Sequence, residues 1–167
     1  MTTISIIGSG NMAAAIGTRA AKRGHTVELM GRDPARARAL ADQIGNGATA
    51  GTFGARPAGD IVVLAVLHTG AVDVVTHYGD ALAGRILVDI TNPFNADVTG
   101  LVSTPGGSVS QQIAAAPEGT HVVKAFNTVF RRRPLTTHGH GATGRRPCGP
   151  GRRRPGSGCG AARRGPW

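Results

Sequence analysis

Cysteine is absent from the first 147 residues of this 167-residue chain. The two cysteines, Cys148 and Cys159, lie close to the C-terminus, so no disulfide framework is predicted for the rest. Ten residues separate them, which fits none of the compact zinc spacings, and no second pair of Cys or His follows. The sequence therefore predicts unpaired surface thiols and no metal site.

Long apolar runs are also missing. The longest strongly apolar run, IVVLAVL at residues 61–67, is far shorter than the roughly 20 residues that cross a bilayer as a helix. The first residues, MTTISIIG, lack the basic segment and the long apolar segment of a secretion signal. We therefore expect a cytoplasmic protein with no membrane partner.

Acidic residues are missing from one part of the chain. The formal net charge of +10 comes entirely from residues 131–167, which contain ten Arg, no Lys and no acid, whereas residues 1–130 are neutral. Arg, Gly, Pro and Ala make up 27 of those last 37 residues, so they cannot bury enough apolar surface to offset the entropy of ordering the chain. We predict a folded domain over 1–130 and a disordered basic tail over 131–167.

The tail has three interpretations: a nucleic-acid-binding or anion-binding arm, an extension without a role, or an out-of-frame reading of a GC-rich gene. Arginine without lysine, and the absence of aromatic residues among the arginines, favour the third. We therefore expect a truncated or frameshifted C-terminus. Nucleic acid should bind the tail only non-specifically, with an affinity that falls steeply as salt rises.

Residues 1–130 alternate β-branched segments with alanine-rich helical segments. Strands are predicted at 3–8, 26–31, 48–51, 60–66, 85–91 and 121–126, and helices at 11–24, 34–45, 70–82 and 109–116. The fourth strand is apolar on both faces, as a central parallel strand covered by helices must be. This order predicts an α/β doubly wound parallel sheet, the Rossmann fold, with six strands and an incomplete C-terminal side.

A glycine-rich turn follows the first predicted strand. Residues 8–13 match G-x-G-x-x-A and consist of Gly8, Ser9, Gly10, Asn11, Met12 and Ala13. Gly8 permits a tight turn, Gly10 lets a pyrophosphate approach the backbone, and the small Ala13 lets the helix pack close to the strand. The strand–turn–helix context predicts a dinucleotide-binding site, with the phosphates at the helix N-terminus.

The end of the second predicted strand indicates which dinucleotide binds. Its sequence is GRDPAR, so Gly31 leaves room for a phosphate and Arg32 offers a planar cation to hold it. Arg36 follows one helical turn later and can reach the same place. Asp33 could instead accept a hydrogen bond from a ribose hydroxyl, but its position before Pro34 favours a helix cap. The sequence thus favours NADP(H) over NAD(H).

Several segments together resemble a known family. ISIIGSGNMAAAIG, GRDPARARALA, GDIVVLAV, ILVDITNPFN and VVKAFNTVF resemble the NADP-dependent oxidoreductases that use the deazaflavin coenzyme F-420, across residues 2–130. The combination of DITNP and KAFNT with the glycine turn carries the resemblance. The turn alone would equally suit pyrroline-carboxylate reductases and the cofactor domains of metalloreductases.

The resemblance implies an enzyme that exchanges hydride between the nicotinamide of NADP(H) and F-420. Both coenzymes bring their own chemistry, so no catalytic residue is assigned. The resemblance places Ser9, Asn11 and Met12 at the pyrophosphate, and Arg32 and Arg36 at the 2′-phosphate. It places the nicotinamide beside Val66, Leu67, His68, Asn92 and Pro93. The junction of the two rings falls at Ala125, Phe126 and Asn127.

The chain departs from the family pattern in two places. Leu67 and His68 stand where the family usually has a proline and an aromatic residue, and His68 is more readily explained as an inert loop residue than as a proton donor. The tail replaces the segments that complete the deazaflavin pocket, so we expect hydride transfer to F-420 to be weak or absent. The open edge beside the sixth strand would also allow a homodimer.

Two alternatives therefore remain. One is an NADP-binding module with an arginine-rich nucleic-acid-binding tail. The other is an imine reductase of the pyrroline-carboxylate reductase type. Small-molecule coenzymes are the expected partners in the favoured interpretation.

Overall fold

A computed structural model shows a six-stranded sheet in which every strand pair is parallel. The structure describes residues 1–95, 99–102, 107–115 and 119–128. The strand order is β3-β2-β1-β4-β5-β6. The strands are β1 (Thr3–Ile7), β2 (Thr26–Gly31), β3 (Thr49–Thr52), β4 (Ile61–Leu64), β5 (Ile86–Asp89) and β6 (His121–Lys124). This is the doubly wound Rossmann arrangement that the sequence predicts.

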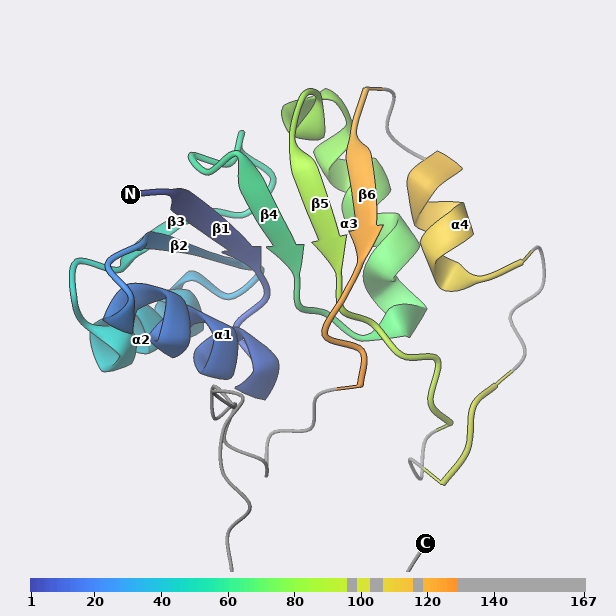
Figure 1. Cartoon of the computed structure of the whole chain (residues 1–167), viewed down its shortest axis with the longest axis horizontal. Coiled ribbons are helices and arrows are strands. Elements are labelled where there is room, and N and C mark those ends of the chain that lie inside the picture. Colours follow the sequence, from blue (N-terminus) through green and yellow to red (C-terminus); the bar gives the residue numbers. More distant parts are fainter. Residues whose placement is uncertain (96–98, 103–106, 116–118, 129–167) are drawn as a thin grey trace, which may run out of the picture. The chain divides into compact units, whose positions relative to one another are not determined.

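Helices connect the strands at the predicted places. They are α1 (Asn11–Lys22), α2 (Pro34–Ile44), α3 (Ala71–Tyr78) and α4 (Val109–Ala115), with short 3₁₀ turns at His68–Gly70 and Gly79–Leu82. Figure 1 shows α1 and α2 beside β1 and β2, and α3 and α4 beside β5 and β6. Within the described residues, no helix is long and apolar enough to cross a membrane.

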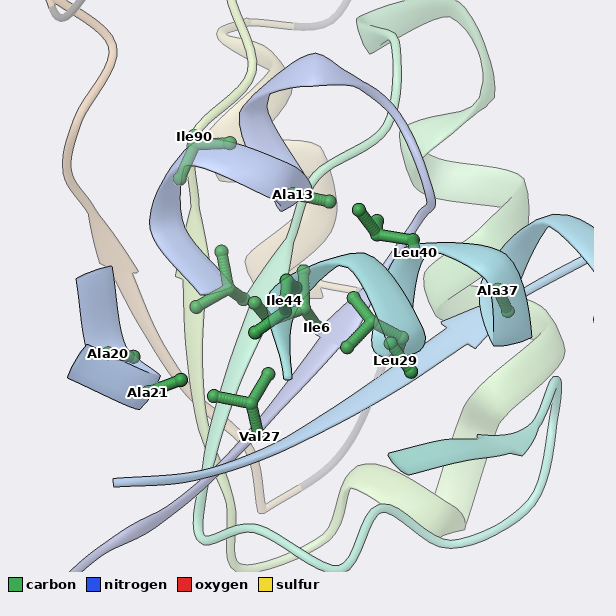
Figure 2. Close-up of a cluster of buried hydrophobic side chains, with 12 residues drawn as sticks. Ile6, Ala13, Ala20, Ala21, Val27, Leu29, Ala37, Leu40, Ile44 and Ile90 are labelled. Carbon is green, nitrogen blue, oxygen red and sulfur yellow. The ribbon is translucent and has the colours of Figure 1, made fainter. Parts of the chain in front are cut away.

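The central strands are buried on both faces, and consecutive residues belong to different cores. On β1, Ile6 packs in a cluster with residues of α1 and α2, whereas Ile7 packs in a cluster with residues of α3 and α4. Leu29 and Met30 of β2 divide in the same way. Figure 2 shows the first cluster, in which Leu40 and Ile44 of α2 meet Ile6 and Leu29 of the sheet. Because side chains alternate across a strand, two helix layers are needed to bury both sets.

Two predictions about the fold fall outside the described residues. The domain boundary at residue 130 and the disordered tail over 131–167 both lie beyond residue 128. Both therefore stay predictions.

Candidate functional site

A cleft of about 690 Å³ opens where β1, β2, β4 and β5 end. All strands run parallel, so the turns that follow them gather at one edge of the sheet. Most of the predicted site residues line this cleft: Gly8, Ser9, Gly10, Asn11, Met12, Arg32, Arg36, Val66, Leu67, His68 and Asn92. Its volume lies within the roughly 300–1,000 Å³ range of ligand pockets.

The glycine turn forms the middle of the cleft, and glycine is needed at positions 8 and 10 for two different reasons. Gly8 has φ +120°, and a Cβ there would lie 2.3 Å from the carbonyl oxygen of Ala65. Protein packing therefore requires glycine at position 8. A Cβ on Gly10 would meet no described atom within 4 Å, and its φ of −90° suits any residue. Glycine at position 10 instead keeps a space open inside the cleft, as a bound pyrophosphate requires.

The N-terminus of α1 faces this space. Gly10 is its N-cap, and no side chain among the described residues caps the helix or places an acid in its first turn. Asn11 and Met12 line the cleft, whereas Ala13 is fully buried in the core. The open helix end attracts an anion through its backbone N–H groups and its dipole.

Two arginines lie at the end of the cleft next to β2. Arg32 and Arg36 both line it, both are exposed, and neither forms an ion pair with a residue that the structure describes. Asp33 is the N-cap of α2, and its carboxylate accepts from the backbone N–H groups of Ala35 at 3.0 Å and Arg36 at 3.2 Å. The prediction that Asp33 caps the helix is confirmed. A phosphate here would meet two cations without an ion-pair partner in the described part of the chain, and one carboxylate whose Oδ1 is occupied by the cap.

The turn after β4 forms the facing wall. Val66, Leu67 and His68 line the cleft as expected, and the side chain of Leu67 is 80% exposed. Phe53, which follows β3, also lines the cleft. Its ring stacks on His77 with centroids 5.3 Å apart and an interplanar angle of 14°. An aromatic wall for a planar ligand group was not predicted.

The remaining predicted residues lie outside the cleft lining. Ala13 is in the core, and Pro93, Ala125, Phe126 and Asn127 do not line the cleft. Asn127 is nevertheless close, because the side-chain amide of Asn92 donates to its backbone carbonyl. The turn after β6 is therefore held against the turn after β5.

An ion pair between a buried carboxylate and a partly exposed lysine joins the ends of β5 and β6. Asp89 is fully buried and accepts from Lys124 Nζ at 2.9 Å, Ser110 Oγ at 2.8 Å and the backbone N–H of Thr91 at 2.8 Å. Burial by itself would raise the pKa of Asp89, but these hydrogen bonds, led by the one from Lys124, lower it below its ordinary value of 3.8. Asp89 is therefore a carboxylate at neutral pH.

Sequence reasoning missed this pair, although both residues stand in motifs that carried the resemblance. Asp89 belongs to DITNP and Lys124 to KAFNT. The available signal was a charged residue at the same place in two successive apolar strands. A partnership could be inferred only from the register, which sets Asp89 opposite Lys124.

Comparison with known proteins identifies the family. A family model described as NADP oxidoreductase, coenzyme F420-dependent, matches residues 3–93, which is more than half of the chain. The chain belongs to this family. The match confirms the predicted resemblance and makes the chain a member of a family of NADP-dependent oxidoreductases.

Solved structures agree with the fold. A hypothetical protein from Sinorhizobium meliloti is 28% identical, with a TM-score of 0.68, and the match covers 78% of this chain and 64% of that one. An imine reductase from Myxococcus stipitatus, in complex with NAD+, is 21% identical with a TM-score of 0.57 and coverage of 74% and 40%. A pyrroline-5-carboxylate reductase from Coxiella burnetii is 17% identical with a TM-score of 0.53 and coverage of 74% and 43%. The chain thus spans less than two thirds of the length of these proteins.

The two glycines of the turn give the first testable prediction. Gly8→Ala should lower the free energy of unfolding by about 2–4 kcal/mol, because the new Cβ collides with a backbone carbonyl and the positive φ is strained. Gly10→Ala, the matched control, should change it by less than about 1 kcal/mol but weaken NADPH binding, because its Cβ occupies the open space. Urea unfolding and NADPH titration measure both. Equal losses of stability would contradict this division of roles.

The second prediction concerns Asp89 and pH. Its folded-state pKa lies below the ordinary value, so its contribution to stability is present above pH 4 and is lost as the pH falls through the folded pKa. Asp89→Asn should therefore cost on the order of 2 kcal/mol at pH 7, and the difference from wild type should shrink toward pH 2.

Asp60→Asn is the control for this experiment. It breaks the ion pair with Arg85 at the opposite end of the sheet, where Asp60 is 85% exposed, and should have little effect at any pH. Urea unfolding between pH 2 and pH 7 gives the measurement. A difference between wild type and Asp89→Asn that stays constant over this range would show that the carboxylate charge plays no part.

Proposed function

We propose that the chain binds NADP(H) in the cleft and exchanges hydride between its nicotinamide and a second small-molecule carrier, the deazaflavin coenzyme F-420. The observation that carries the proposal is the charge arrangement after β2. Arg32 and Arg36 face the cleft without an ion-pair partner in the described residues, while Asp33 is engaged in capping α2. This arrangement suits a 2′-phosphate, because two cations face the one acid that lines this cleft among the described residues, Asp33, whose Oδ1 is occupied by the cap.

The order of parts along the cleft supports one orientation of the dinucleotide. With the 2′-phosphate at Arg32 and Arg36 and the pyrophosphate at Gly10, the nicotinamide extends toward the ends of β4 and β5. That end is lined by Val66, Thr91 and Asn92. The adenine then falls beside Phe53, whose ring offers a flat apolar surface.

When bound, the two coenzymes would supply the chemistry, a hydride passed from C4 of the nicotinamide to C5 of the deazaflavin. The residues of the chain bind the dinucleotide and orient its nicotinamide ring. The glycine turn and the end of α1 hold the pyrophosphate, the two arginines hold the 2′-phosphate, and the β4 and β5 turns fix the plane of the ring. No side chain of the chain is required to carry a proton.

The third prediction tests the choice of dinucleotide. Wild type should bind NADPH more tightly than NADH, and Arg32→Ala should weaken NADPH roughly 10–100-fold while leaving NADH nearly unchanged, because only NADPH offers a partner for the guanidinium. Fluorescence titration of both cofactors gives the constants.

Arg38→Ala is the matched control for this titration. Arg38 is an exposed arginine of the same helix as Arg36 and does not line the cleft, so its removal should leave both affinities unchanged. Equal losses for NADPH and NADH in Arg32→Ala would rule out a 2′-phosphate site.

The fourth prediction concerns hydride transfer itself. With saturating NADPH, the deazaflavin absorbance should fall much more slowly than the roughly 10 per second of an ordinary enzyme. The reason is exposure: Leu67 lines the cleft and is 80% exposed, so water reaches the end of the cleft where the two rings would stack.

Turnover near 10 per second would contradict the predicted slow transfer, would show that the rings are well enclosed, and would support hydride exchange with F-420. Oxidation of NADPH by a cyclic imine, with no reaction toward F-420, would favour an imine reductase instead.

A further inference from the structure

The ion pair between Asp89 and Lys124 does more than join two strands, because both of its members also hold Thr91. Asp89 Oδ1 accepts from the backbone N–H of Thr91, and Lys124 Nζ donates to the backbone carbonyl of Thr91 and contacts its Oγ1 at 3.3 Å. Three polar atoms of one residue are thus fixed by one pair of charges. Thr91 lines the cleft, whereas Asp89 and Lys124 do not.

The turn after β6 is held by the same group of residues. The backbone N–H of Ala125 donates to the carbonyl of Asp89 at 3.1 Å, and Asn92 donates to the carbonyl of Asn127. Between these two contacts Phe126 has φ +57°, in the left-handed region that costs a non-glycine residue of order 1 kcal/mol or more. A backbone of this kind persists only where its neighbours are fixed, as they are here.

A second ion pair provides a comparison, because in the described part of the chain it has no hydrogen bond to the residues that line the cleft. Arg85 pairs with Asp60 at the other end of β5. Neither residue lines the cleft, and neither is hydrogen bonded to a residue that does, among the contacts of the described residues. The desolvation of the buried Asp89 carboxylate offsets much of the attraction to the partly exposed Lys124, so net stability alone gives a weak reason for this pair.

We propose that Asp89 and Lys124 are positioning residues for the nicotinamide: they fix Thr91, Asn92 and the turn after β6 so that this end of the cleft has one shape. The inference rests on the proposed function, because it takes the nicotinamide to lie at the ends of β4 and β5. Neither residue touches the ring. Their effect on binding is transmitted through the backbone of Thr91 and the Asn92–Asn127 contact.

The test separates the two halves of the dinucleotide. Dissociation constants are measured for NADPH and for adenosine 2′,5′-bisphosphate, which carries the adenosine and the 2′-phosphate but has no nicotinamide. Lys124→Met should weaken NADPH on the order of tenfold and leave the bisphosphate within about twofold of wild type. Lys124→Arg, which keeps the cation and its donors, should restore most of the NADPH affinity.

Arg85→Met is the matched control. It replaces a cation by an apolar side chain next to the other end of β5, away from the cleft, and should change neither dissociation constant. If Lys124→Met does not fold, Lys124→Gln takes its place, because glutamine keeps hydrogen-bond donors at this position without the charge. Thermal unfolding of each variant records its stability separately from binding.

Each outcome decides between the inference and the proposed function. Selective loss of NADPH supports the positioning role. Equal losses for both ligands, or no loss for either, overturn it while leaving the NADP site in place. Failure of the wild type to bind the bisphosphate overturns the proposed function itself. If wild type binds the bisphosphate as tightly as NADPH, only the inference is overturned. The nicotinamide then adds nothing to the affinity, so its position cannot affect binding.

Discussion

The close approach of the β1 turn to the end of β4 is the constraint on which the site depends. A Cβ at Gly8 would lie 2.3 Å from the carbonyl of Ala65, so the two chain segments come this near only because position 8 is glycine. β1 and β4 are the neighbours from which the strand order runs outward in both directions. The connections that follow β1 and β4 run to opposite faces of the sheet, and the turns at the ends of these two strands diverge to form a cleft. The glycine turn, the arginines after β2 and the turn after β4 meet there for this reason.

The polar residues at the two ends of the cleft are held in different ways. Arg32 and Arg36 are exposed, and the Asp33 cap fixes only the backbone of Arg36 at the start of α2. Long solvated cations suit a phosphate, which accepts hydrogen bonds from many directions. Thr91 is held by a buried carboxylate and a lysine, so its backbone is fixed before a ligand arrives, and the side chain of Asn92 is tied to the carbonyl of Asn127. A flat ring needs a defined orientation to react, which a preformed surface supplies.

The sequence predicted the parts of the molecule that local patterns determine. The strand segments, the G-x-G-x-x-A turn and the Asp33–Pro34 helix start each depend on residues close in the chain, and the structure has all three. Phe53 and the Asp89–Lys124 pair escaped prediction because their roles depend on tertiary neighbours. Phe53 reaches the cleft through its contact with His77 of α3, 24 residues later. Asp89 meets Lys124 only because β6 pairs with β5 in one register. Residues 125–127, which the resemblance places at the junction of the two rings, do not line the cleft, and the carbonyl of Asn127 accepts from the cleft residue Asn92.

A crystal structure of the chain with NADP+ tests the central claim most directly, because that claim assigns each half of the dinucleotide to one end of the cleft. The account predicts the 2′-phosphate at about 3 Å from the guanidinium of Arg32 or Arg36, the pyrophosphate against Gly10, and the nicotinamide beside Thr91 and Asn92. A dinucleotide bound in the reverse orientation, or a 2′-phosphate in contact with neither arginine, would contradict it.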